Sequence, residues 1–203
     1  RDNFCNPLIN TNNPTNHKII FEPPWSGYNT KETKDKWGIS DCWSEDTEIN
    51  GAYGKTTIHS WAGPGAGWAS ILMSLRHYDG FRPPKDAEYS FTFKLKQDGE
   101  IKLNSMYDVF GSSAAKGGVS FYFYLWDGKT IYFEKSVNVK EHYSIGGVGN
   151  GGFPYAITKT YSNSARLQKD VSYTYGAYGI PWIACDGFAI ATGIADQLVY
   201  RTV

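Results

Sequence analysis

The chain has 203 residues, of which 41% are hydrophobic and only 20% charged, and its 20 basic and 20 acidic side chains cancel at neutral pH. A length of this order fits one all-β sandwich, so we expect a single domain over residues 1–203. The charge balance, without a basic cluster, argues against nucleic acid as a partner. No apolar run reaches the roughly 18 residues of a membrane helix, so no transmembrane segment is predicted.

Aromatic residues and glycine are unusually frequent. The chain holds 15 Tyr, 11 Phe and 7 Trp, together 16% of its residues, and 22 Gly. This combination favours strands joined by tight turns, and helical periodicity is weak throughout. We therefore predict an all-β protein, an antiparallel β-sandwich of jelly-roll type.

The first quarter of the chain differs from the rest. Residues 1–54 are rich in Asn, Pro, Gly and Thr, and apart from Lys18 to Glu22 they show no sustained period. We expect a long, irregular, loop-rich N-terminal arm that packs on a sandwich formed by residues 55–203.

From Lys55 onward, strand signals recur about every ten residues, a spacing typical of sandwiches and barrels. The predicted strands are 55–61, 68–76, 88–96, 100–110, 119–125, 129–139, 155–161, 170–175, 186–192 and 197–203. In the second of them, alternation places Ala69, Ile71, Met73 and Leu75 in the core.

Two hairpins are predicted with their register. Odd positions from Tyr89 to Leu95 are apolar, and so are Ile101 and Leu103. A loop of three residues, Gln97 to Gly99, keeps the odd positions on the core side of both strands. The same reasoning places Phe121, Phe123, Leu125, Ile131 and Phe133 in the core, with Trp126-Asp127-Gly128 as the loop.

The second hairpin leaves an aromatic stripe on its other face. Tyr122, Tyr124 and Tyr132 point away from the core, and Trp126 lies in the turn. Sugar rings stack their C–H faces on aromatic rings, while hydroxyl and carboxylate side chains bind their OH groups. These four residues are therefore candidate ligand contacts for a glycan or polysaccharide. The alternative is that the N-terminal arm covers the stripe.

A second aromatic group surrounds the segment Gly-Ala-Tyr-Gly-Ile-Pro, which we interpret as a turn. Loops at the end of a sandwich often carry binding sites. Tyr175, Tyr178 and Trp182 are therefore further ligand-binding candidates. Ordinary packing at a strand end is the alternative.

No catalytic residue is assigned. His59 stands on the outer face of its predicted strand, and with Arg76 and a nearby Tyr it would resemble the site of a polysaccharide lyase. A solvent-facing, partly packed histidine is the favoured alternative. Acidic residues such as Glu134 are read as surface charges rather than as a glycosidase pair.

The glycine-rich segment Ser144 to Pro154 is expected to be a flexible loop that could act as a lid. No Lys-Ser or Lys-Thr pair and no helix follow it, so a nucleotide site is rejected. We predict no cofactor. Glu22 and Asp186 offer oxygen ligands for calcium, but their spacing predicts no calcium site and the metal stays open.

The three cysteines, Cys5, Cys42 and Cys185, allow at most one internal bridge. In an oxidising compartment we favour Cys5 to Cys42, because both lie in the sequence of the arm. Three buried free thiols are the alternative.

Phe21-Glu22 early, an aromatic-rich middle and Asp186-Gly-Phe-Ala-Ile late give an order of features that resembles jelly-roll carbohydrate-binding modules. The leading hypothesis is a non-catalytic, extracellular carbohydrate-binding module, secreted or at a cell or virion surface. One alternative is a structural, assembly or adhesive surface protein, such as a capsid, surface-layer or pore-forming subunit. The other is a polysaccharide lyase or glycoside hydrolase. A homo-oligomer stays open.

Overall fold

The computed structural model describes residues 17–106, 110–146 and 148–202. Within these ranges no helix has the length and apolar character needed to cross a membrane. The described residues form nine strands: β1 (His17–Phe21), β2 (Gly27–Ile49), β3 (Tyr53–Phe81), β4 (Ala87–Met106), β5 (Ser112–Trp126), β6 (Ile131–Gly146), β7 (Gly149–Leu167), β8 (Tyr173–Ala189) and β9 (Thr192–Thr202).

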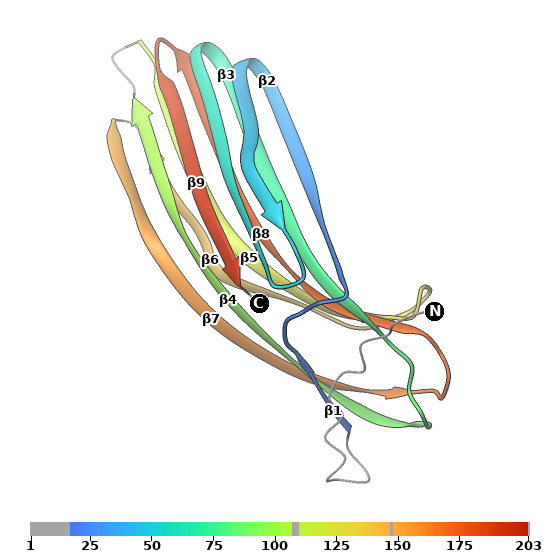
Figure 1. Cartoon of the computed structure of the whole chain (residues 1–203). Helices are drawn as coiled ribbons and strands as arrows, with labels where there is room; N and C mark the ends of the chain where they lie inside the picture. Colours follow the sequence, from blue (N-terminus) through green and yellow to red (C-terminus); the bar gives the residue numbers. More distant parts are fainter. Residues whose placement is uncertain (1–16, 107–109, 147, 203) are drawn as a thin grey trace.

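The strands are long and form two layers. The chain crosses from one layer to the other at one end of the molecule, which we call the turn end (Figure 1). β2 and β3 each bend there, and β8 gives way there to β9. The first layer contains the first half of β2, the second half of β3, and then β8, β5 and β6. The second contains the other halves of β2 and β3, and then β9, β4 and β7. The two layers enclose the core.

This arrangement confirms an all-β sandwich, although hydrogen bonds join all nine strands into one sheet. The sheet is mixed rather than antiparallel throughout, because β1 pairs with β4 in parallel. The jelly-roll type stays a prediction. Neighbouring predicted strands also merge. The predicted strands 55–61 and 68–76 both belong to β3, and 88–96 and the first part of 100–110 both belong to β4.

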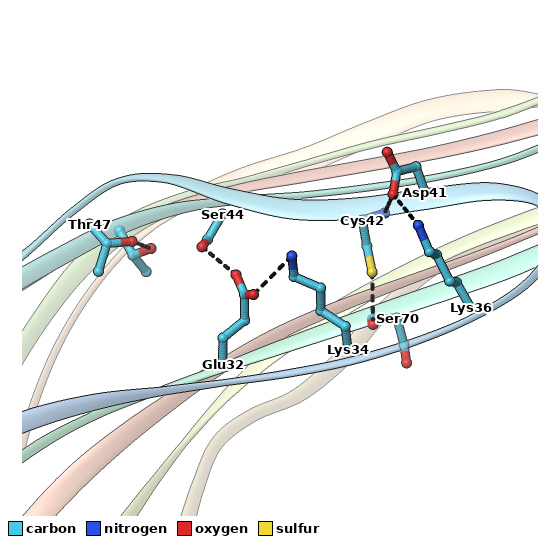
Figure 2. Close-up of polar contacts among 9 residues, drawn as sticks. Glu32, Lys34, Lys36, Asp41, Cys42, Ser44, Thr47 and Ser70 are labelled. Carbon is cyan, nitrogen blue, oxygen red and sulfur yellow. Dashed lines mark hydrogen bonds and ion pairs between the residues drawn. The ribbon is translucent and has the colours of Figure 1, made fainter.

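The prediction of an irregular arm is wrong for much of residues 17–54, which contain β1 and β2. The sequence hides β2 because it is an edge strand that pairs only with β3 and exposes nearly all of its side chains. Charged side chains are typical of such edges. Several of them link the two halves of β2: Lys36 Nζ lies 2.9 Å from Asp41, and Ser44 donates to Glu32 (Figure 2).

The first predicted hairpin does not exist. β4 runs through Gln97 to Gly99 without a turn, and Gly99 is not among the glycines with positive φ. A three-residue loop keeps the odd-numbered positions facing inward, and an uninterrupted strand does the same. The alternation of apolar residues therefore could not distinguish a hairpin from one continuous strand. The core side was nonetheless predicted correctly: Phe93, Ile101 and Leu103 are buried.

The second hairpin exists with a longer loop. β5 ends at Trp126 and β6 begins at Ile131, and Gly128 has a φ of 94° as expected. The register shifts between the pairs Leu125–Phe133 and Trp126–Ile131. Phe133 is therefore buried as predicted, whereas Ile131 points outward and is 54% exposed.

The core between the layers divides into two clusters of different composition. The aromatic cluster lies away from the turn end and contains Phe21, Phe91, Phe93, Phe121, Phe123, Phe133, Tyr89, Tyr173 and Tyr175 among its buried residues. The small-residue cluster lies toward the turn end and contains Ala62, Ala69, Ala115, Ala195, Cys42 and Cys185, with Ile58, Ile71, Met73 and Ile183 among its larger members. Ala69, Ile71, Met73 and Leu75 all face inward as predicted.

Two further expectations are corrected. Cys42 and Cys185 are free, buried thiols, so the predicted Cys5–Cys42 bridge is absent; Cys5 lies outside the described residues. The glycine-rich segment is no loop, because Ser144–Gly146 belongs to β6 and Gly149–Pro154 to β7. Gly152, with a φ of 145°, approaches β4 so closely that a Cβ would lie 2.0 Å from Ile101 O, and this contact explains the need for glycine.

Candidate functional site

Aromatic side chains gather on the outer face of the first layer. Tyr122 of β5 pairs in register with Tyr178 of β8, and Tyr178 pairs with Arg76 of β3. The ring centroids of Tyr122 and Tyr178 lie 4.6 Å apart, and Arg76 Cζ lies 4.9 Å above the Tyr178 ring. Three strands thus contribute to one row of planar groups in contact, in which the Tyr122 and Tyr178 rings are tilted by 37°.

This row is part of a pocket of about 280 Å³. Glu134 pairs with Tyr124 in the regular ladder, and the bulge at the start of β6 places Ile131 opposite Trp126 on the outer face. Rings form most of the walls, and the lining also includes one cation and one carboxylate. The lining residues are Arg76, Tyr122, Tyr124, Trp126, Ile131, Glu134 and Tyr178.

A glycine on β8 sets the position of one wall. Gly176 pairs in register with Tyr124, and a Cβ at Gly176 would lie 2.9 Å from the Tyr124 hydroxyl oxygen and 2.7 Å from His77 O. Only a residue without a side chain lets the Tyr124 ring approach β8 so closely. The ring is consequently half-buried, and this burial raises the pKa of Tyr124.

The polar groups of the pocket retain hydrogen-bonding capacity. Burial also raises the pKa of Tyr178, so both tyrosine hydroxyls are protonated at neutral pH and can donate. Arg76 Nε donates to Ser74 Oγ over 3.2 Å, which fixes the guanidinium over Tyr178. Glu134 supplies carboxylate oxygens as acceptors. The pocket thus offers ring faces, two hydroxyls, a cation and an anion.

The structure brings together four of the seven candidates, Tyr122, Tyr124, Trp126 and Tyr178. Tyr132 does not line the pocket. Because of the bulge, Ile131 rather than Tyr132 lies opposite Trp126. The Tyr132 hydroxyl instead donates to Asp127, at 2.9 Å.

The other two candidates lie elsewhere. Tyr175 is only 1% exposed and belongs to the aromatic cluster, because the predicted turn is the middle of β8 and odd positions there face inward. Trp182 is partly exposed on the same outer face, beside Leu72 and Gly118, but outside the pocket. Glu134 was expected near the aromatic stripe of the hairpin. Sequence reasoning did not place Arg76 in this site, because its proximity depends on the strand order β3-β8-β5-β6, and it missed Ile131 because of the bulge.

The lyase arrangement of His59 with Arg76 is not formed. His59 lies on the second layer, where its Nδ1 is 2.7 Å from Asp196 and its Nε2 is 2.6 Å from Glu45. Its ring stacks on Trp43 at 4.8 Å. Arg76 lies on the outer face of the first layer, so no substrate could contact both side chains in one cleft. The described residues also hold no group of three or more His, Cys, Asp or Glu side chains arranged to bind a metal ion.

No protein-family model and no curated protein matches the chain. Among solved structures, the enzymatically active domain of tailspike protein 4 of bacteriophage CBA120 matches at 11% identity and a TM-score of 0.22, over 88% of this chain and 20% of that one. The C-terminal CBM6 of LamC, a marine laminarinase from Zobellia galactanivorans, matches at 13% identity and a TM-score of 0.20, over 78% of this chain and 99% of that one.

The T13 viral particle of infectious bursal disease virus matches at 8% identity and a TM-score of 0.16, over 86% of this chain and 39% of that one. The chain therefore spans a fifth of the tailspike domain and well under half of the capsid chain. Similarity this low does not establish a function, which must be argued from the pocket.

Proposed function

We propose that this chain is a non-catalytic carbohydrate-binding module whose ligand occupies the pocket between β3, β8, β5 and β6. The observation that carries the proposal is the convergence of Tyr122, Tyr124, Trp126 and Tyr178 around one hollow that also holds Arg76 and Glu134. We place the protein outside the cell, secreted or at a surface, where polysaccharides are accessible.

The chemistry of the pocket suits a sugar ring. A pyranose has apolar C–H faces and a rim of hydroxyl groups, so it needs flat apolar walls together with both donors and acceptors. The Tyr122 and Tyr178 rings supply the walls. The Tyr124 hydroxyl and Arg76 can donate to sugar hydroxyls, and Glu134 can accept from them. Because the pocket holds one cation and one anion, we expect a neutral glycan rather than a strongly charged one.

Calorimetry against soluble neutral polysaccharides, chosen by a glycan-array screen, tests the proposal. In the double variant Tyr124→Ala, Trp126→Ala we expect affinity to fall by about 2 kcal/mol, roughly thirtyfold, since each stacking ring contributes on the order of 1 kcal/mol. The matched control is Tyr28→Ala, Trp37→Ala, which removes an exposed Tyr and an exposed Trp outside the pocket. Equal binding by the folded pocket variant and the wild type would show that the ligand binds elsewhere.

A self-associating surface protein is the second candidate. The observation that favours it is the apolar rim of the pocket, where Trp126 and Ile131 are 41% and 54% exposed and could be covered by another copy. Light scattering separates the two candidates. A monomer with glycan affinity supports the binding module, whereas a defined oligomer without glycan affinity supports assembly.

A further inference from the structure

The turn end carries large apolar side chains that project into solvent. They come from four of the five chain segments that join the layers, the bend of β3 contributing none, and they are between 44% and 75% exposed. Packing in the core therefore does not account for them. They are Ile39, Met106, Phe110, Val148, Phe188 and Ile190.

The bends of β2 and β3, the β4–β5 turn and the β8–β9 turn form one continuous surface. A Cβ on Gly63, in the bend of β3, would lie 2.1 Å from Ala191 O, between β8 and β9. A Cβ on Gly111 would lie 2.4 Å from Phe188 O, and Gly65 lies directly beside Ile39. The bends of β2 and β3 and the β8–β9 turn stand side by side at the top of Figure 1. The apolar side chains thus rise from a backbone of small residues that are packed against one another.

The surface also lacks charge. The described residues of the turns, 38–40, 63–67, 110–115, 148–153 and 187–195, include no Asp, Glu, Lys or Arg. Asp41, Asp186 and Asp196 directly flank these ranges, and Asp108, between Met106 and Phe110 in the sequence, lies outside the described residues. With 40 charged residues in a chain of 203, the absence of charge from the described residues of these turns is a distinct feature of the molecule.

Polarity changes in a fixed order away from the turns. Trp37 and Trp68 pair in register immediately beside the bends of β2 and β3, and Trp37 is 60% exposed. The next positions include the ion pair Lys36–Asp41, with 2.9 Å between Nζ and Oδ1. Asp186 pairs in register with Trp68, so the order is apolar tips, then tryptophan together with charges. A lipid bilayer presents the same order from its hydrocarbon core through its interface to water, and tryptophan is enriched at that interface.

We propose that the turn end docks on a lipid bilayer, with the apolar tips inserted among the acyl chains and Trp37 and Trp68 at the headgroup level. A protein partner would be expected to meet a flatter patch with polar groups at its rim. Separate projecting side chains without charges suit a fluid partner, which adapts to their shape and needs no matching hydrogen bonds.

This orientation keeps the pocket accessible. β5 begins at the turn end and runs 15 residues to Trp126, about 45 Å along the strand at a rise of about 3.3 Å per residue. The opening beside Trp126 would thus face away from the membrane. The lipid proposal does not depend on the sugar site, since the two surfaces share no residue.

Co-flotation with phosphatidylcholine vesicles, which carry no sugar, tests the proposal. We expect the wild-type chain to float with the vesicles and its tryptophan fluorescence to be quenched by brominated lipid. In the variant Phe188→Ser, Ile190→Ser we expect partitioning to fall at least about tenfold, because two large apolar contacts are lost. The matched control Ile20→Ser, Tyr28→Ser removes two exposed side chains that lie outside both the turn end and the pocket, and it should partition like the wild type.

Several outcomes would overturn the proposal. One is a wild-type chain that stays with the buffer, and another is equal loss in both folded variants. A third is a concentration-dependent dimer in light scattering that Phe188→Ser, Ile190→Ser abolishes while no vesicle binding occurs, which would make the turn end an interface between copies.

Discussion

The two clusters of the core differ in how they fill the gap between the layers. Near the turn end the layers are close: Ser60 Oγ of the second layer donates to Ala69 O of the first over 2.8 Å, and Cys185 Sγ reaches Ser60 O at 3.3 Å. Such short side chains can span the gap only where the chain has just crossed between layers. Farther from the turns the gap is filled by Phe and Tyr rings, such as Phe93 and Phe123 at 5.3 Å.

The open side of the sandwich is also closed differently in the two regions. Beside the aromatic cluster, Ile19 and Phe21 of β1 and then Trp25 cover the core with apolar surface. Beside the small-residue cluster, β2 contributes one buried side chain, Cys42, and otherwise polar contacts. We therefore expect the aromatic region to provide most of the apolar burial that stabilises the fold.

The largest effect is expected from the aromatic cluster. Phe93→Ala should lower the free energy of unfolding by about 3–5 kcal/mol, because it removes a fully buried ring. Denaturant melts measure this loss. The control Phe188→Ala removes an exposed ring and should change stability by less than about 0.5 kcal/mol. A loss below about 1 kcal/mol for Phe93→Ala would contradict the central role of the aromatic cluster.

Sequence patterns predicted this core well because burial follows from alternation alone. Phe91, Phe93, Phe121 and Phe123 face inward whether or not a turn separates their strands. The pattern could not locate the turns, since Gln97-Asp98-Gly99 has the composition of a turn and yet continues a strand. The edge strand β2 was missed because it buries almost nothing and therefore carries no apolar period.

The candidate site was predictable only in part, for a related reason. Alternation identified which residues of β5 point outward, and that was sufficient for Tyr122 and Tyr124. The neighbours that complete the pocket, Arg76 and Tyr178, come from strands far away in the sequence. Only strand order brings them together, and a local pattern contains no information on strand order. The exchange of Tyr132 for Ile131 depends on a single bulge.

The next largest effect on stability is expected in the small-residue cluster. There, enlarging a side chain rather than truncating one should destabilise the protein. Ala69→Leu adds volume where the layers are close and should cost about 1–3 kcal/mol in denaturant melts. The control Ser136→Leu makes a comparable enlargement at an exposed strand position. If Ala69→Leu stabilises the protein, the small-residue cluster contains space that the side-chain contacts do not reveal.

A smaller effect is expected from the Cys185 thiol. Burial raises its pKa from 9.0 to about 12. The unfolded thiol loses its proton near pH 9 and the folded thiol only near 12, so the stabilisation is complete below pH 9 and is lost as pH rises through about 12. Between pH 8 and pH 10, wild type should lose about 1 kcal/mol more stability than Cys185→Ala. Equal losses would show that the thiol ionises as readily in the folded protein.

The smallest effect is expected where β2 closes the sandwich with charges. Lys36 and Asp41 form an ion pair at 2.9 Å, and both side chains are more than half exposed (Figure 2). The hydrogen bond from Lys36 is the largest cause that lowers the pKa of Asp41. Water and salt nevertheless screen such a pair, so we expect a coupling energy of about 0.2–1 kcal/mol from the double-mutant cycle of Lys36→Ala and Asp41→Ala.

High salt provides the control for this pair. At about 1 M salt the Debye length falls to about 3 Å, and the coupling between Lys36 and Asp41 should become smaller still. A coupling above about 1.5 kcal/mol that persists in high salt would mean that β2 is held on the sandwich by these charges. In that case the polar closure would stabilise the turn-end region much as Ile19, Phe21 and Trp25 stabilise the aromatic one, and the contrast between the two regions would be confined to their cores.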